Sequence, residues 1–228
     1  MSYRRRALLL LALATVAGVT YLRGYRIYEP ALLALALGSL IERDALRFIG
    51  WRRSDVRPTA IAGMFAVAVG LNAFGKFILA PAVWAFTGSQ HDLSSFDYLR
   101  GDGWAVLRMF VYVWPIVATC EELIFRGFLL RYLIDAGGRA RAPIVVVAIV
   151  LSNAFFGVMH SYQGLPGILL TGTLGAIFAV IYLWCGRALL PVILVHGFFD
   201  TVSLLAIATN LDRAIRPLQE SISRAFGG

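Results

Sequence analysis

The stretch "CEELIFRG", Cys120 to Gly127, places two glutamates and an arginine in the middle of a long apolar segment. The run "WAVLRMFVYVWPIVAT" precedes it and "FLLRYLI" follows it. A charged side chain at the centre of a membrane helix costs about 2.5–3.5 kcal/mol on insertion scales. Three charges together in such a helix therefore indicate a specific structural or chemical role.

The rest of the chain is as apolar as the segment around these charges. Of the 228 residues, 59% are hydrophobic and only 15% are charged, which is far from the composition of an ordinary soluble domain. We predict an all-α fold, a polytopic transmembrane helical bundle of about seven to eight membrane helices. The apolar segments are roughly 7–22, 30–42, 59–86, 104–134, 143–160, 166–185 and 188–209.

We predict one integrated membrane domain with three parts. Residues 1–100 hold the N-terminal membrane helices and a cytoplasmic basic loop, residues 101–209 hold the polar motifs, and residues 210–228 form a basic interfacial tail. Lys76 and Pro81 are expected to interrupt the apolar segment 59–86.

The net charge of +8 comes almost entirely from arginines that gather at the ends of the apolar runs. That distribution orients membrane proteins, and it predicts an integral membrane protein with a cytoplasmic N-terminus. Without a basic face that carries interleaved aromatic residues, nucleic acid is not an expected partner. The Arg-rich composition is typical of a GC-rich bacterial genome, so we expect the bacterial inner (plasma) membrane. Seven spans place the tail outside despite its arginines, so it is an interfacial helix or the span count differs by one.

The polar residues have a helical spacing. Glu122 and Arg126 are four apart and share one helical face, which predicts an ion pair. Glu121 lies about 100° around the helix from Glu122 and has no partner at a favourable offset on its own helix.

Three further polar residues interrupt later apolar segments. His160 ends the segment 143–160, and His196 and Asp200 lie four apart on one face of the segment 188–209. Ionisable residues at membrane depth usually face a bundle interior or a wet cavity, where they pair with one another. We therefore expect the side chains from these three helices, Glu121 included, to meet in one cavity. In the segment 166–185, the small residues Gly167, Thr171 and Gly175 share one helical face, which predicts close helix packing.

Such a cluster suits more than one chemistry. A carboxylate and an imidazole can activate a water molecule together, and a second histidine with a polar partner can donate a hydrogen bond to an oxyanion. These parts are sufficient to hydrolyse an amide. The same groups also suit a divalent metal such as zinc, with Glu121, His160 and His196 as its ligands.

Three short motifs, in chain order, resemble one family. "EELIFR" matches E-E-x-x-x-R, "FGVMH" from Phe156 to His160 matches F-x-x-x-H, and "HGFFD" matches H-x-x-x-N/D. Over about residues 100–205 the chain resembles the CAAX protease and bacteriocin-processing (CPBP, Abi-like) family of intramembrane proteases.

The resemblance implies a role for each matched residue. Glu121 would be the catalytic glutamate and His160 would help it to activate water. His196 and Asp200 would form the oxyanion site, while the supporting residues are Glu122, Arg126 and Phe156. Eukaryotic members have Asn where this chain has Asp200, so here the aspartate must be protonated or must only orient His196. Both metal-dependent and glutamic-type mechanisms have been described for the family, and the sequence leaves the two open.

The function expected from this resemblance is endoproteolysis of a membrane-associated peptide or protein near its C-terminus, beside the lipid bilayer. Two alternatives remain open. The same cluster could serve a proton- or cation-coupled transporter, or the fold could be kept by a non-catalytic bacteriocin-immunity protein. Each residue alone also has a simpler interpretation: an ion pair for Glu122 and Arg126, an interfacial position for His160, and an intrahelical bond between His196 and Asp200.

Overall fold

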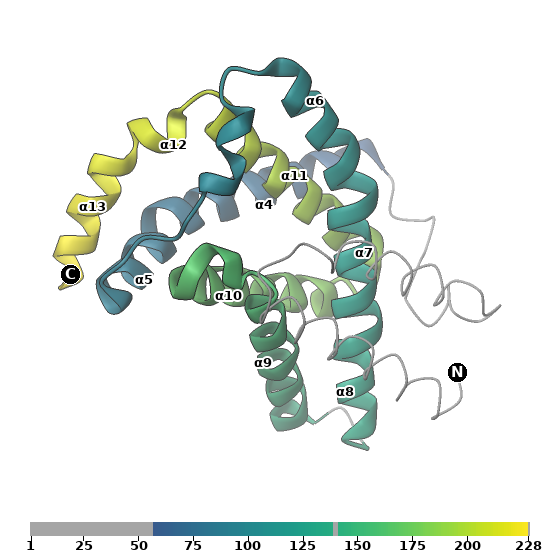
Figure 1. Ribbon diagram of the computed structural model, residues 1–228. Coiled ribbons are helices and arrows are strands. Elements are labelled where there is room, and N and C mark those ends of the chain that lie inside the picture. Colours follow the sequence, from purple (N-terminus) through teal and green to yellow (C-terminus); the bar gives the residue numbers. More distant parts are fainter. Residues whose placement is uncertain (1–56, 139–140, 228) are drawn as a thin grey trace.

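The structure is a computed structural model, and it describes residues 57–138 and 141–227. This part of the chain is mainly helical and holds no strand (Figure 1). Four of its helices are long and apolar enough to cross a membrane, and a fifth apolar helix is shorter. The four are Pro58–Thr87, Gly103–Ala136, Ser161–Trp184 and Leu189–Ala208, and the shorter one is Ala142–Val158.

These helices confirm the all-helical membrane fold and agree with the last five predicted segments to within a few residues. The predicted segments 7–22 and 30–42 and the basic loop after them lie outside the described residues. The count of seven to eight membrane helices therefore stays a prediction.

The first long helix consists of α4 (Pro58–Phe74), a π-helical stretch (Gly75–Leu79) and α5 (Ala80–Thr87). The interruption expected at Lys76 and Pro81 does not occur, because the chain passes from α4 to α5 through the π-helical stretch. Proline has no N–H and its ring crowds the preceding turn, and a wider turn is one way to accommodate it.

The second long helix carries the glutamates, and its hydrogen bonding changes along its length. Asp102 caps its start by accepting a hydrogen bond from the Ala105 amide at 2.9 Å. Two π-helical stretches flank a short α-helical segment that holds Glu121 and Glu122. Such stretches often mark functional positions in helices. The elements are α6 (Gly103–Tyr112), Val113–Ala118 (π), α7 (Thr119–Glu122), Leu123–Leu130 (π) and α8 (Arg131–Ala136).

The last apolar helices are α9 (Ala142–Val158), α10 (Gly164–Trp184) and α11 (Leu189–Ala208). They are followed by two helices of the tail, α12 (Leu211–Ala214) and α13 (Arg216–Ala225). Short 3₁₀ segments lie at Ser94–Leu99 and Ser161–Gln163.

Helices α9 and α10 cross with their backbones in close contact. A Cβ atom on Gly157 would lie 2.4 Å from the Ile168 carbonyl oxygen and 3.2 Å from the Cα of Gly172. Of the predicted small-residue face, Gly175 lies at this interface, because a Cβ there would meet Asn153 at 2.6 Å. The backbone of α10 that lies closest to Gly157 includes Gly172, which was not part of the predicted small-residue face.

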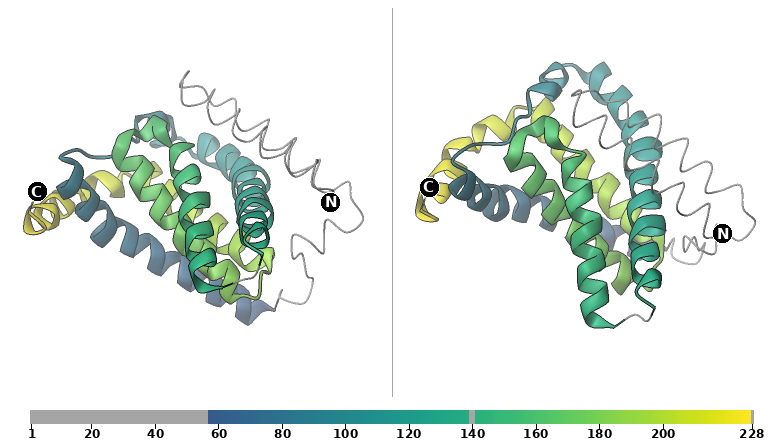
Figure 2. Two further views of the ribbon diagram at one scale, coloured as in Figure 1. Left: turned by 90° about the horizontal axis from the view of Figure 1, so that it is seen from below. Right: turned by 60° about the horizontal axis from the view of Figure 1, so that its bottom comes forward.

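The segment Thr87–Gly103, the turn after α9 and the tail lie together (Figures 1 and 2). Arg100 joins two of these segments, since it binds both carboxylate oxygens of Asp212 at 2.8 Å. The tail helix α13 packs against α5, and Gln219 donates a hydrogen bond to the Lys76 carbonyl at 2.8 Å. The tail is thus part of the bundle.

Large apolar side chains remain exposed on the outer faces of the long helices. In a membrane these faces contact lipid, so their exposure fits an integral membrane protein. They include Phe65, Ile78, Phe86, Trp104, Val111, Val180 and Trp184, and Val146 and Val150 are exposed on the shorter helix α9.

Candidate active site

One cavity of about 280 Å³ lies among the long helices. Its lining includes Glu121, His160, His196 and Asp200. The structure therefore brings the four predicted site residues to one cavity, from the second long helix, the end of α9 and the middle of α11.

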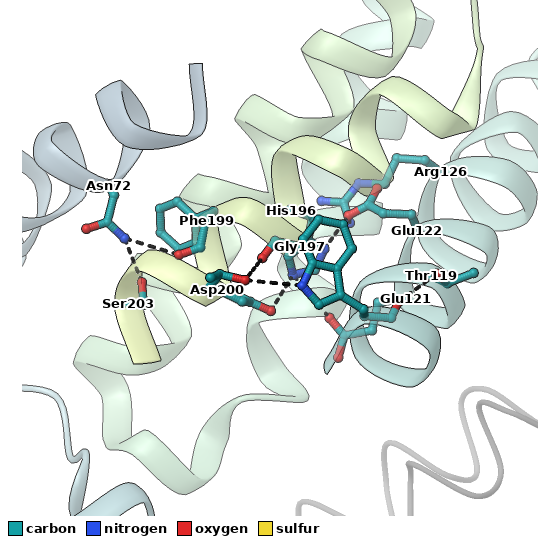
Figure 3. A network of polar contacts seen from close by, with 12 residues as sticks. Asn72, Thr119, Glu121, Glu122, Arg126, His196, Gly197, Phe199, Asp200 and Ser203 are labelled. Atoms are coloured by element: carbon teal, nitrogen blue, oxygen red, sulfur yellow. Dashed lines mark hydrogen bonds and ion pairs between the residues drawn. The ribbon is translucent and has the colours of Figure 1, made fainter. Parts of the chain in front are cut away.

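Glu122 is the centre of a buried polar network beside this cavity (Figure 3). Its Oε1 accepts hydrogen bonds from Arg126 Nη1 at 2.9 Å and from His196 Nδ1 at 2.7 Å. The Glu122 and Arg126 side chains are 0% and 1% exposed. The predicted ion pair is confirmed, and it extends to His196, which the spacing of the motif did not reveal.

Arg126 is fully hydrogen-bonded at its outer nitrogen. Its Nη2 donates to Asn153 Oδ1 at 3.2 Å and to the Gly175 carbonyl at 2.7 Å. The guanidinium also lies over the Phe156 ring, 4.9 Å from the ring centroid. One arginine therefore ties the second long helix to both α9 and α10.

The second nitrogen of His196 faces two more carboxyl groups. Its Nε2 lies 3.4 Å from Asp200 Oδ2 and 3.9 Å from Glu121 Oε2. The adjacent glutamates thus contact opposite sides of one imidazole, which follows from their offset of about 100° around the helix. Glu121 Oε2 is buried and has no hydrogen-bond partner in the described part of the chain.

His160 has a fixed orientation at the end of α9. Its Nδ1 lies 2.9 Å from the Phe156 carbonyl oxygen. A carbonyl oxygen only accepts hydrogen bonds, so Nδ1 carries the proton, and the Nε2 of the neutral ring has a free lone pair. The Phe156 ring packs 4.9 Å from the His160 ring, which gives the F-x-x-x-H spacing a physical basis.

Several polar residues that hold α11 in place were not predicted. Asn72 of α4 donates hydrogen bonds to Ser203 Oγ at 2.6 Å and to the Phe199 carbonyl at 3.3 Å, on either side of Asp200. Trp114 Nε1 donates to Thr201 Oγ1 at 3.2 Å. An asparagine inside the apolar segment 59–86 is a signal that sequence reasoning could have used, whereas Trp114 offers none.

The residue types at the cavity suit zinc. Zinc requires its donor atoms about 2.0–2.2 Å from one point. Within residues 57–138 and 141–227, no group of three or more His, Cys, Asp or Glu side chains is arranged to hold a metal ion. A metal held by Glu121, His160 and His196 stays a prediction.

The fold and the site define a helical membrane protein with a buried cluster of carboxyl and imidazole groups at one cavity. Residues 103–202 match the family model of the type II CAAX prenyl endopeptidase Rce1-like proteins. This region contains all three motifs, and the match confirms the resemblance to the CAAX protease family. No curated protein and no solved structure matches the chain.

Proposed function

We propose that this protein is an intramembrane endopeptidase that hydrolyses a peptide bond in a membrane-proximal protein or peptide. The observation that carries the proposal is the gathering of Glu121, His160, His196 and Asp200 at one cavity, inside the region that matches the protease family. The cavity lies among helices that are long and apolar enough to cross a membrane, which favours a substrate at the membrane.

In the proposed reaction, Glu121 and His160 activate a water molecule. Glu121 Oε2 is a buried acceptor without a hydrogen-bond partner among the described residues, and His160 Nε2 offers a lone pair. Water bound between them gives its proton to the glutamate as its oxygen attacks the peptide carbonyl. The same proton then passes to the leaving amine as the C–N bond breaks, which returns the carboxylate to its starting state.

His196 is the proposed donor to the oxyanion. With Nδ1 bound to Glu122, it can donate from Nε2 only when both ring nitrogens carry protons. The carboxyl groups of Glu122, Asp200 and Glu121 around the ring stabilise that cation. Asp200 then orients the ring, or in its protonated form donates a second hydrogen bond.

The test is cleavage of a membrane-tethered peptide by the purified protein in detergent. Glu121→Gln keeps the size of the side chain but cannot accept the proton from water. We expect turnover to fall by about 10²–10⁴-fold while peptide binding survives. Asp135→Asn is the matched control. Asp135 is exposed near the C-terminal end of the second long helix, so this variant should cleave the peptide normally.

Two further measurements separate the mechanisms. His160→Ala should lower turnover similarly, and the double variant should lose little more, because two residues that act on one water are non-additive. Undiminished cleavage by Glu121→Gln would end the glutamate-base mechanism. Loss of activity on chelation, restored by zinc, would instead make Glu121 a metal ligand. Ion flux through the protein in liposomes without any cleavage would favour the transporter alternative.

A further inference from the structure

The cavity has a second end, away from the glutamates. Residues of α5, of the segment after it and of the tail line this end. Its charged or polar lining residues include His91, Asp212, Arg216 and Gln219, together with Lys76 of the π-helical stretch before α5. The region that matches the protease family does not include Lys76, His91 or Arg216. The charged residues of this end therefore come from the parts of the chain outside that region.

Lys76 is the only lysine of the chain, and it lies inside an apolar helix that is long enough to cross a membrane. A cation at that depth is costly and normally has a partner or a function. Arg216, at the start of α13, lines the same end of the cavity, and its Nε is buried without a hydrogen-bond partner in the described part of the chain.

Neither of these two cations forms an ion pair with a carboxylate among the described residues. In residues 57–138 and 141–227, no ion pair within 4.0 Å includes Lys76 or Arg216. Asp212 lines this end too, but Arg100 binds both of its oxygens at 2.8 Å. Glu220, four residues after Arg216, accepts a hydrogen bond from Gln90 at 3.0 Å instead. The second end therefore carries an excess of positive charge.

His91 adds a neutral donor to this end. Its Nδ1 accepts a hydrogen bond from Trp84 Nε1 at 3.2 Å. Since an indole N–H only donates, the proton of the neutral His91 ring is on Nε2. The polar groups around Lys76 and Arg216 thus include a further N–H, which suits an anionic ligand.

The opposite end of the cavity has the opposite chemistry. It holds the carboxyl groups of Glu121 and Asp200, and many apolar side chains also line the cavity. The apolar lining residues include Leu170, Leu174, Phe178, Leu204 and Ile207. A single extended ligand with apolar side chains can place an amide at the first end and an anion at the second.

We propose that Lys76 and Arg216 form a subsite for a carboxylate of the peptide substrate, remote from the bond that is cleaved. The inference rests on the proposed protease function, since it assumes a peptide in the cavity. The carboxylate can be the C-terminus of the peptide or an acidic side chain. A carboxylate bound by two cations in a partly buried site makes strong charge-assisted hydrogen bonds.

The test measures binding by the full-length Glu121→Gln protein in detergent, so that cleavage does not interfere. Three fluorescent peptides share one apolar sequence: a free acid, its C-terminal amide, and an amide whose last residue is glutamate. The free acid should bind about 10-fold or more tightly than the neutral amide. Adding Lys76→Gln or Arg216→Gln should abolish this preference without weakening the binding of the neutral amide.

Matched variants keep the test interpretable. Lys76→Arg and Arg216→Lys preserve the charge and should preserve the preference. Arg224→Gln removes an exposed cation from the same helix α13 and should leave the preference unchanged. Tight binding of the free acid alone identifies the C-terminus as the ligand, and tight binding of both acidic peptides identifies any carboxylate near the end of the substrate.

Chemical labelling gives a second readout, because Lys76 carries the only side-chain amine of the chain. The free-acid peptide should protect it from an amine-reactive reagent, as followed by mass spectrometry, and the amide should not. Equal binding of all three peptides, or a preference that survives both glutamine variants, overturns the inference. Protection by vesicles of an anionic phospholipid but by none of the peptides overturns it as well.

The two proposals can fail separately. If the unmodified protein cleaves the acidic and neutral peptides equally well, the protease proposal is supported and the carboxylate subsite is contradicted. If charge-dependent binding is found but no cleavage, the subsite stands and the protease fails.

Discussion

Glu122 is the residue on which the geometry of the site depends most. Its carboxylate holds Arg126 on one side and His196 on the other, at 2.9 and 2.7 Å. Both bonds are made out of contact with solvent, where a charge without its partner is costly. The residue thus contributes to stability and also sets the orientation of the histidine that we propose as the oxyanion donor.

Glu122→Ala should therefore destabilise the protein by about 3–5 kcal/mol, because it leaves Arg126 buried without its anion. Thermal unfolding in detergent measures this loss. Asp97→Ala is a matched control, since Asp97 pairs with Arg100 and Arg213 but is 47% exposed, and exposed pairs contribute about 0–1 kcal/mol each. A Glu122→Ala protein as stable as its parent but inactive would show that Glu122 acts in the chemistry.

His91 should make stability depend on pH. Burial, together with the nearby Arg216 cation, lowers the pKa of His91 to about 4. An unfolded histidine has a pKa of about 6.5, so between these values the unfolded state binds more protons and stability falls as the pH falls. Above about pH 6.5 this contribution is complete, and below about pH 4 no more is lost.

The measurement is the unfolding temperature in detergent from pH 8 to pH 4, compared between the parent and His91→Asn. Asparagine keeps an acceptor for Trp84 but does not titrate. The variant should lose less stability than the parent on acidification. Parallel curves for the two proteins would show that the pKa of His91 does not differ between the folded and unfolded states.

At the scale of helices, the crossing of α9 and α10 depends on glycine. Gly157 lies where any side chain would meet the backbone of α10, with the Ile168 oxygen 2.4 Å from an added Cβ. Backbone atoms cannot move aside without separating the helices. Because α9 ends in the turn that carries His160, a wider crossing would also displace that histidine from the cavity.

Gly157→Ala should destabilise the protein by about 1–3 kcal/mol, the usual cost of overpacking. It should also lower cleavage. Gly70→Ala is the matched control, since Gly70 is helical and an added Cβ has nothing within 4 Å. Alanine is the better helix former, so the control should be unchanged or slightly more stable. Equal unfolding temperatures for the two variants would contradict the close packing.

At the scale of the whole molecule, the tail closes one end of the cavity. Arg100 connects the segment before α6 to Asp212 in α12, and Gln219 of α13 bonds the backbone of the first long helix. These contacts join parts of the chain more than a hundred residues apart. The basic tail therefore completes the cavity, in addition to any contact it makes with the membrane surface.

Asp212→Ala should loosen this connection. Backbone amides of α13 should exchange with deuterium roughly 10-fold faster, because a charge-assisted bond of about 1.5–3 kcal/mol no longer resists local opening. Asp135→Ala is the control. Asp135 lies 4.0 Å from Arg187, both side chains are partly exposed, and the pair is far from α13. Unchanged exchange in α13 would mean that other contacts hold the tail.

Much of this architecture can be predicted from the sequence, because local rules decide it. Apolar runs of sufficient length predict the five apolar helices of the described region, since a helix satisfies its backbone hydrogen bonds in lipid within a single segment. The i,i+4 spacing predicts the bond between Glu122 and Arg126, because four residues bring two side chains to one face. The three motifs also predict the family resemblance.

The remaining features are contacts between residues that are distant along the chain. The bond between Glu122 and His196 spans 74 residues, and that between Asn72 and Ser203 spans 131. No local periodicity encodes such pairs, because they depend on how the helices cross. The apposition of Lys76 and Arg216 at one cavity has the same origin. The sequence thus determines which helices form and which charges they carry, while helix packing alone decides which of those charges share a cavity.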